Sequence, residues 1–174
     1  MKSIKNYLTL IAIMLFSLPS MAQEMSEDEA IECIKTYIDS QKSGFGKFDE
    51  TLRVTLANIQ VDGNRVKIVF NKEDGNFSPL FPELTEGKFK TDAQENRYVN
   101  RQYGLYTLAH EVHNNPKFLE ALEKSKFKWD VFIMDSHQNV PYYTFTFSFQ
   151  NIINSINLNN GDVASDFKTF LSTS

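Results

Sequence analysis

An aromatic stretch, residues 127–149, limits the folds open to this chain more than any other segment. Between residues 143 and 149 every second side chain is aromatic, and the side chains between them carry hydroxyl groups. This period of two is typical of a β-strand with one buried face and one wet face. The aromatic residues are Tyr143, Phe145, Phe147 and Phe149, and the hydroxyl residues are Thr144, Thr146 and Ser148.

The residues just before this strand predict a partner for it. Residues 129–134 are apolar on both alternating faces apart from Asp130, which is typical of an interior strand. The polar segment that follows ends in Pro141, which cannot donate a ladder hydrogen bond, so we expect a hairpin. Because one face of this hairpin is strongly aromatic, helices elsewhere in the chain must cover it.

The first half of the chain predicts one helix and a second hairpin. Ser26 and Glu29 have the spacing of a capping box, and an apolar stripe continues to about residue 40. Residues 52–70 alternate as two strands around a turn at residues 62–64. The inward and outward positions exchange near Ala57 and Asn58, which indicates a β-bulge.

Three further helices complete the predicted fold. A long helix begins near Thr91, a short one begins at Pro116 with Asn115 as its cap, and a last one follows Asp162 as its cap. The sequence therefore predicts an α+β single domain. We expect an antiparallel sheet of two hairpins, about four strands, packed on one face by three to four helices.

Residues 1–22 have the pattern of a secretory signal peptide. Lys2 and Lys5 precede an apolar run from Leu8 to Leu18, and small residues stand before and at Ala22. The run is shorter than the roughly 20 residues that a membrane helix needs, although an uncleaved anchor is the alternative. Cleavage would leave one domain, residues 23–174, in the periplasm or outside the cell, with no integral membrane segment.

The charge and cysteine content of residues 23–174 restrict the partners and the chemistry. This part of the chain has 22 acidic and 16 basic residues, a formal balance of −6, which disfavours nucleic acid as a partner. Cys33 is the only cysteine, so the domain folds without an internal disulfide. Because Cys33 lies within a predicted helix, we expect it to be a small, buried side chain.

Residues 71–90 show no periodicity, although they contain several large apolar side chains as well as Pro and Gly. Loops of this length are uncommon in compact domains and are often functional. The segment either closes one end of the core or presents a surface to a partner. The predicted partner-binding residues are Glu73, Asp74, Phe77, Leu80, Phe81 and Glu83.

The chain contains no catalytic motif that we can identify. His110, Glu111 and His113 lie near the end of the long helix, but the zinc-protease motif needs its histidines four residues apart. A Gly-x-Ser-x-Gly nucleophile motif is also absent from the sequence. We therefore predict no catalytic residue, no metal ligand and no cofactor.

These features predict an exported, non-enzymatic protein-binding domain. It could be an inhibitor, an immunity-type antagonist or an accessory subunit, and its acidic surface suits a cationic partner. The alternative is a small-ligand-binding protein or hydrolase with a pocket between the long helix and the sheet. Three tyrosines would line that pocket, namely Tyr98, Tyr103 and Tyr106.

Overall fold

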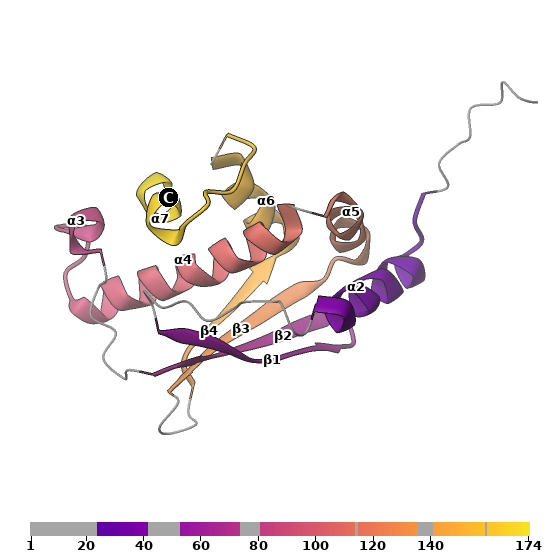
Figure 1. Ribbon diagram of the computed structural model, residues 1–174, viewed down its shortest axis with the longest axis horizontal. Coiled ribbons are helices and arrows are strands. Elements are labelled where there is room, and N and C mark those ends of the chain that lie inside the picture. The colour runs from indigo at the N-terminus through magenta and orange to yellow at the C-terminus, as the bar shows by residue number, and fades with distance from the viewer. Residues whose placement is uncertain (1–23, 42–52, 74–80, 114, 136–140, 159) are drawn as a thin grey trace, which may run out of the picture.

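Four strands form one sheet that lies below a layer of helices (Figure 1). The computed structural model describes residues 24–41, 53–73, 81–113, 115–135, 141–158 and 160–174. The predicted signal peptide, residues 1–22, lies outside these residues. The strands are β1 (Val54–Asp62), β2 (Arg65–Lys72), β3 (Lys128–Asp135) and β4 (Pro141–Ser148), in the order β1-β2-β3-β4.

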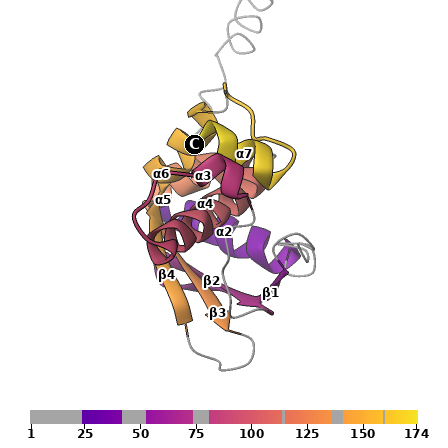
Figure 2. The same ribbon diagram turned by 90° about the vertical axis from the view of Figure 1, so that its left-hand side faces the viewer.

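Six helices are present in the described segments, and they gather on one side of the sheet (Figures 1 and 2). The predicted α+β fold is thus confirmed, with more helices than the three to four expected. No helix in the described segments is long and apolar enough to cross a lipid bilayer. The helices are α2 (Glu27–Gln41), α3 (Pro82–Thr85), α4 (Asp92–His113), α5 (Pro116–Ser125), α6 (Phe149–Leu158) and α7 (Phe167–Thr173).

Both predicted hairpins form, and local sequence signals explain them. In the β1–β2 hairpin Gly63 has a φ of +58°, a conformation that glycine adopts without strain. The pairing register shifts between Leu56 and Asn58, so the predicted bulge is confirmed. In the β3–β4 hairpin Trp129 pairs with Phe147, Val131 pairs with Phe145, and Ile133 pairs with Tyr143.

The two hairpins join through a parallel pair, whereas the sequence predicts an antiparallel sheet throughout. β2 and β3 run parallel, with Arg65 opposite Lys128 and Lys72 opposite Asp135. The reason is the 22-residue helix α4, which lies between the two hairpins in the chain and is about 33 Å long. It carries the chain back across the sheet, so β3 begins at the end where β2 began. The sheet is therefore mixed.

The helix-covered face of the sheet forms the hydrophobic core. Its side chains are at most 5 % exposed, and Trp129, Val131, Ile133 and Phe147 are completely buried. Gly104 of α4 sits directly above this face, because a Cβ atom there would lie 3.2 Å from the Phe147 ring. The core strand residues are Val54, Ile59, Val66, Ile68, Phe70, Trp129, Val131, Ile133, Phe145 and Phe147.

Three local predictions differ from the structure near the C-terminus and in the long loop. Phe149 is the first residue of α6 and not the last of β4. The cap of α7 is Asp166, whose Oδ1 accepts a hydrogen bond from the Thr169 backbone N–H at 2.9 Å. Asp162 instead accepts from the backbone N–H of Val163. The short helix α3, which begins at Pro82, was not predicted because four residues show no periodicity.

The opposite face of the sheet carries the hydroxyl side chains of β4, as the alternating pattern predicts, together with the half-buried Val69, Phe132 and Met134, and no helix of the described segments covers it (Figure 2). Thr144 and Thr146 are exposed there. Asp130 is nevertheless only 6 % exposed, since it accepts two hydrogen bonds from the Arg65 guanidinium and a third from the Thr146 hydroxyl at 2.7 Å. The hydrogen bond with Arg65 holds the pKa of Asp130 below its usual range, and that with Thr146 also lowers it.

We expect Asp130→Asn to lower the free energy of unfolding by about 1–3 kcal/mol at pH 7. The contribution of Asp130 is complete above the ordinary aspartate pKa of about 3.9 and is lost as the pH falls through the lowered folded-state pKa. The loss caused by the substitution should therefore shrink between about pH 5 and pH 2. Urea unfolding across this range measures it, and a loss that stays constant with pH would contradict the assignment.

Candidate functional site

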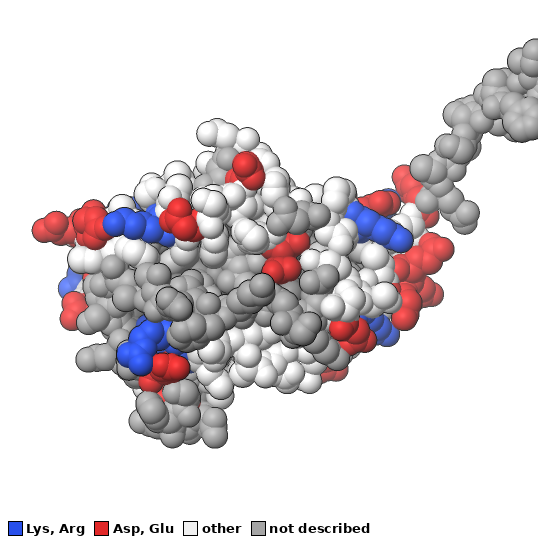
Figure 3. Space-filling view, in the orientation of Figure 1, with Lys and Arg blue, Asp and Glu red and all other residues white. Residues whose placement is uncertain are grey.

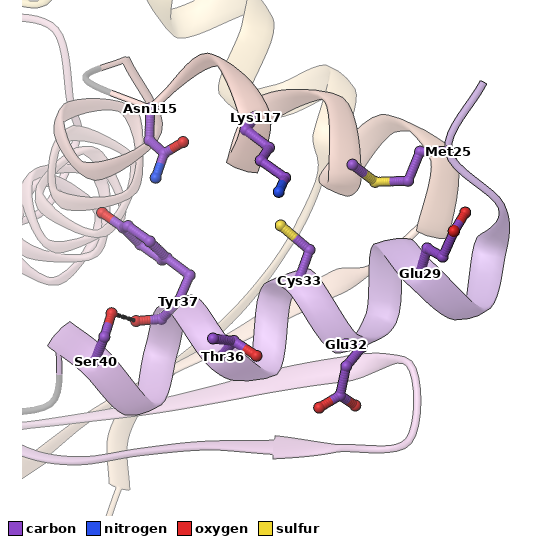
Figure 4. A pocket seen from close by; sticks show the side chains of 9 residues that line it. All are labelled: Met25, Glu29, Glu32, Cys33, Thr36, Tyr37, Ser40, Asn115 and Lys117. Atoms are coloured by element: carbon purple, nitrogen blue, oxygen red, sulfur yellow. Dashed lines mark hydrogen bonds between the residues drawn. The ribbon is translucent and has the colours of Figure 1, made fainter. Parts of the chain in front are cut away.

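A hollow of about 650 Å³ lies between α2 and α5 (Figure 4). One face of α2 buries Ala30, Ile34 and Ile38 in the core, and the neighbouring face looks toward α5. We call this hollow the α2–α5 cleft. It is lined by Met25, Glu29, Glu32, Cys33, Thr36, Tyr37, Ser40, Asn115 and Lys117.

The start of α5 is fixed by local chemistry, and this places one wall of the cleft. The Asn115 side chain accepts a hydrogen bond from the Phe118 backbone N–H at 3.0 Å, and Pro116 follows it as the first helical residue. The predicted cap is confirmed. Lys117 therefore projects from the first turn of α5 toward Cys33 of α2 (Figure 4).

Tyr37 connects the cleft to both neighbouring helices. Its ring stacks on Phe118 of α5 with a centroid distance of 4.2 Å, and its hydroxyl donates to Glu111 Oε2 of α4 at 3.2 Å. Burial, with the nearby carboxylate of Glu111, raises the pKa of Tyr37 to about 12. Burial also raises the pKa of Glu111. Tyr37 therefore stays a neutral donor that holds three helices together at this end of the cleft.

The acidic surplus of the protein is concentrated on the two helices that form the cleft. Residues 24–41 and 116–125 together contain eight acidic and three basic residues, a balance of −5. This is nearly all of the −6 carried by residues 23–174. Acidic side chains crowd the end of the molecule where α2 begins (Figure 3).

Few basic side chains pair with the acidic side chains at the cleft. Glu29 accepts hydrogen bonds from the backbone N–H and the hydroxyl of Ser26, both at 2.8 Å, which hold its pKa below the usual range. Glu24 pairs with Lys124 at 3.2 Å across the two helices. Glu32 is highly exposed and lies 4.0 Å from Lys35. The cleft thus combines an apolar floor with a negatively charged rim.

Of the predicted loop residues, the three that the structure describes, Glu73, Phe81 and Glu83, do not line this cleft. Asp74, Phe77 and Leu80 fall outside the described residues. Glu73 is exposed at the end of β2 and pairs with Arg53 at 2.9 Å.

The end of the long loop rests on α7. The half-buried Phe81 ring packs against Phe167 at a centroid distance of 6.1 Å. Glu83 pairs with Lys168 at 2.6 Å, which lowers the pKa of Glu83. Lys168 also lies 5.5 Å above the Phe81 ring. Phe81 and Glu83 therefore both contact α7, and their role in partner binding stays a prediction.

His110, Glu111 and His113 of α4 each contact a different residue. His113 Nε2 lies 3.0 Å from Asp162 Oδ1, the His110 ring lies 5.9 Å from Tyr106, and Glu111 faces Tyr37. Among the described residues no group of three potential metal ligands comes together.

The tyrosines expected to line a pocket pack against other aromatic rings. Tyr103 is 5 % exposed and meets Phe70 and Phe167 edge to face at 5.7 and 5.4 Å. The Tyr106 hydroxyl donates to the Ser165 carbonyl at 3.2 Å, which anchors α4 to the segment before α7.

No family model, curated protein or solved structure matches the chain. The site must therefore be interpreted from its own residues. Sequence reasoning missed the α2–α5 cleft because each acidic residue at the start of α2 has a local explanation as a helix-start residue. The signal that could have found it is the difference in charge between these two helices and the rest of the chain.

Proposed function

We propose that this chain is an exported, non-enzymatic protein-binding domain that holds a basic segment of its partner in the α2–α5 cleft. The observation that carries the proposal is the collection of nearly all the net negative charge on the two helices that form the cleft, with Glu29 and Glu32 in its lining. Complementary charge steers a cationic partner toward such a surface and raises the association rate. Export rests on the signal-peptide pattern of residues 1–22.

The cleft suits the anchor of an interface better than a whole interface. Its volume of about 650 Å³ accommodates a few side chains, whereas a stable protein complex buries roughly 1,200–2,000 Å². Met25, Cys33 and Tyr37 offer an apolar floor, and Glu29 and Glu32 offer carboxylates at the rim. This arrangement fits a segment that presents an apolar side chain flanked by Lys or Arg. An inhibitor, an immunity-type antagonist or an accessory subunit would work in this way.

A pair of charge-swapped peptides tests the proposal. The probe is a helical peptide of leucine and lysine, and the control has glutamate in place of each lysine. We expect the full chain to bind the lysine peptide saturably by fluorescence anisotropy, and to ignore the glutamate peptide. Binding should weaken as ionic strength rises, because the charges lie at the surface. Equal binding of the two peptides, or binding of neither, would count against the proposal.

A further inference from the structure

The sheet ends in two edge strands, β1 and β4, which differ in how well their edges are protected. They lie on opposite sides of the sheet (Figure 2). β1 is interrupted by the register shift between Leu56 and Asn58, and a bulge of this kind hinders pairing with a further strand. β4 instead pairs with β3 in unbroken register from Tyr143 to Ser148. It contains no charged side chain, and within the described segments no strand pairs with its other edge.

The hydrogen bonds of β3 show which backbone groups of β4 point toward it. The Lys128 backbone N–H donates to the carbonyl of Asn64, which directly precedes β2, at 3.2 Å. Backbone groups alternate in direction along a strand, so those of the next residue, Trp129, point toward β4. Trp129 lies opposite Phe147, and the backbone groups of Phe147 therefore point toward β3.

The backbone groups of Thr144 and Thr146 consequently face the free edge of β4. The contact of Ser148 agrees with this alternation, because its N–H donates to Asn151 Oδ1 of α6 at 2.9 Å and not to β3. Thr144 and Thr146 share the parity of Ser148, and both are exposed. Two N–H donors and two C=O acceptors are thus presented in the pattern that an added β-strand requires.

A positive charge lies beside this edge on the helix-covered side. Arg97 of α4 is exposed, and its guanidinium lies 5.2 Å from the centroid of the Phe145 ring, between the two threonines in β4. Arg97 forms no ion pair with another described residue. Residues 141–161 contain no charged side chain, so neither β4 nor α6 offers an acid to this guanidinium.

We infer that the free edge of β4 binds an extended segment of a partner protein that carries acidic side chains at alternate positions. The segment would pair with the backbone of Thr144 and Thr146 and extend the sheet by one strand. Its side chains on the helix-covered side would lie beside Phe145, where a carboxylate complements the Arg97 guanidinium.

A second copy of this chain fits the edge less well than an acidic segment. Antiparallel pairing of two β4 strands would bring both Arg97 side chains to the same face of the joined sheet, and like charges there repel. The edge shares no residue with the α2–α5 cleft, so the inference goes beyond the proposed function and does not depend on it.

The test uses a peptide of about ten residues in which threonine and glutamate alternate, and a control with lysine in place of each glutamate. The backbone amide signals of Thr144 and Thr146 in the full-length chain are followed by ¹H–¹⁵N NMR. We expect saturable shifts with the glutamate peptide and much weaker binding of the lysine peptide at this edge. The net charge of the chain, −4, would favour the opposite order. Equal or tighter binding of the lysine peptide there, or no saturable shift with the glutamate peptide, would overturn the inference.

N-methylated peptides test whether the contact is a β-ladder. A strand pairs with β4 through one of its two edges, so only every second N–H of the peptide faces β4. One glutamate peptide is methylated at the threonine nitrogens and another at the glutamate nitrogens. We expect one of the two to lose binding and the other to keep it. Equal effects of the two methylation patterns would contradict strand addition.

Arg97→Gln should weaken binding of the glutamate peptide by about fivefold, because the charge pair is exposed. Lys35→Gln is the matched control, since it removes the same charge from α2, which contacts β1 at the opposite edge of the sheet. Its affinity should be unchanged, and an equal loss in the two variants would refute the role of Arg97. Without peptide, shifts of Thr144 and Thr146 that depend on protein concentration would assign the edge to a second copy and overturn the inference.

Discussion

Phe118→Ala is expected to lower the free energy of unfolding by about 3–5 kcal/mol. The Phe118 side chain is 1 % exposed and connects three elements of the fold. It stacks on Tyr37 of α2 and meets Trp129 of β3 edge to face at 5.9 Å, while its own backbone N–H donates a hydrogen bond to the Asn115 side chain that caps α5. Its removal leaves a cavity that these rings cannot close without moving α2 or α5.

Urea unfolding of the full chain at pH 7, followed by tryptophan fluorescence, measures this loss because Trp129 is the only tryptophan and contacts Phe118. Leu119→Ala is the control. Leu119 is the next residue of the same helix but is only partly buried, so about 1 kcal/mol is expected there. If the two variants lose the same stability, the ring of Phe118 is not what holds α5 to the sheet.

The elements that the sequence predicts best are those set by neighbouring residues. Asn115 and Pro116 define the start of α5, and the exchange of parity near Asn58 defines the bulge of β1, because both depend on hydrogen bonds within a few residues. The parallel pairing of β2 with β3 depends instead on the path of α4, which no local pattern records. The same limit applies to the α7 cap, where Asp162 and Asp166 are both suitable residues.

The candidate site was not predictable for a related reason. Residues 24–41 and 116–125 lie far apart in the sequence, and their acidic residues look like ordinary helix surfaces when each helix is taken alone. Only the packing of α2 against α5 gathers them around a cleft. Cys33 illustrates the same point, because its place in an apolar stripe predicts burial, yet it is half-buried and lines the cleft.

Reversing the charge of one acidic residue on each helix of the cleft should slow association with the lysine peptide by about tenfold at low ionic strength. The substitutions are Glu32→Lys on α2 and Glu120→Lys on α5, which lies one turn from Lys117. Both residues are exposed and lie away from the helix ends, so folding should be little affected. Stopped-flow fluorescence at several salt concentrations measures the rate. The effect should shrink at about 0.15 M salt, where the screening length is about 8 Å.

Two further variants separate the cleft from the net charge of the protein. Glu86→Lys with Asp92→Lys changes the net charge by the same amount at the far end of α4, near α3, and should alter the rate much less (Figure 1). Lys117→Ala removes the only cation among the described residues that line the cleft, and should strengthen binding of the lysine peptide. If the distant pair slows association as much as the cleft pair, net charge alone explains the attraction. If Lys117→Ala weakens binding, the peptide does not occupy the cleft between α2 and α5.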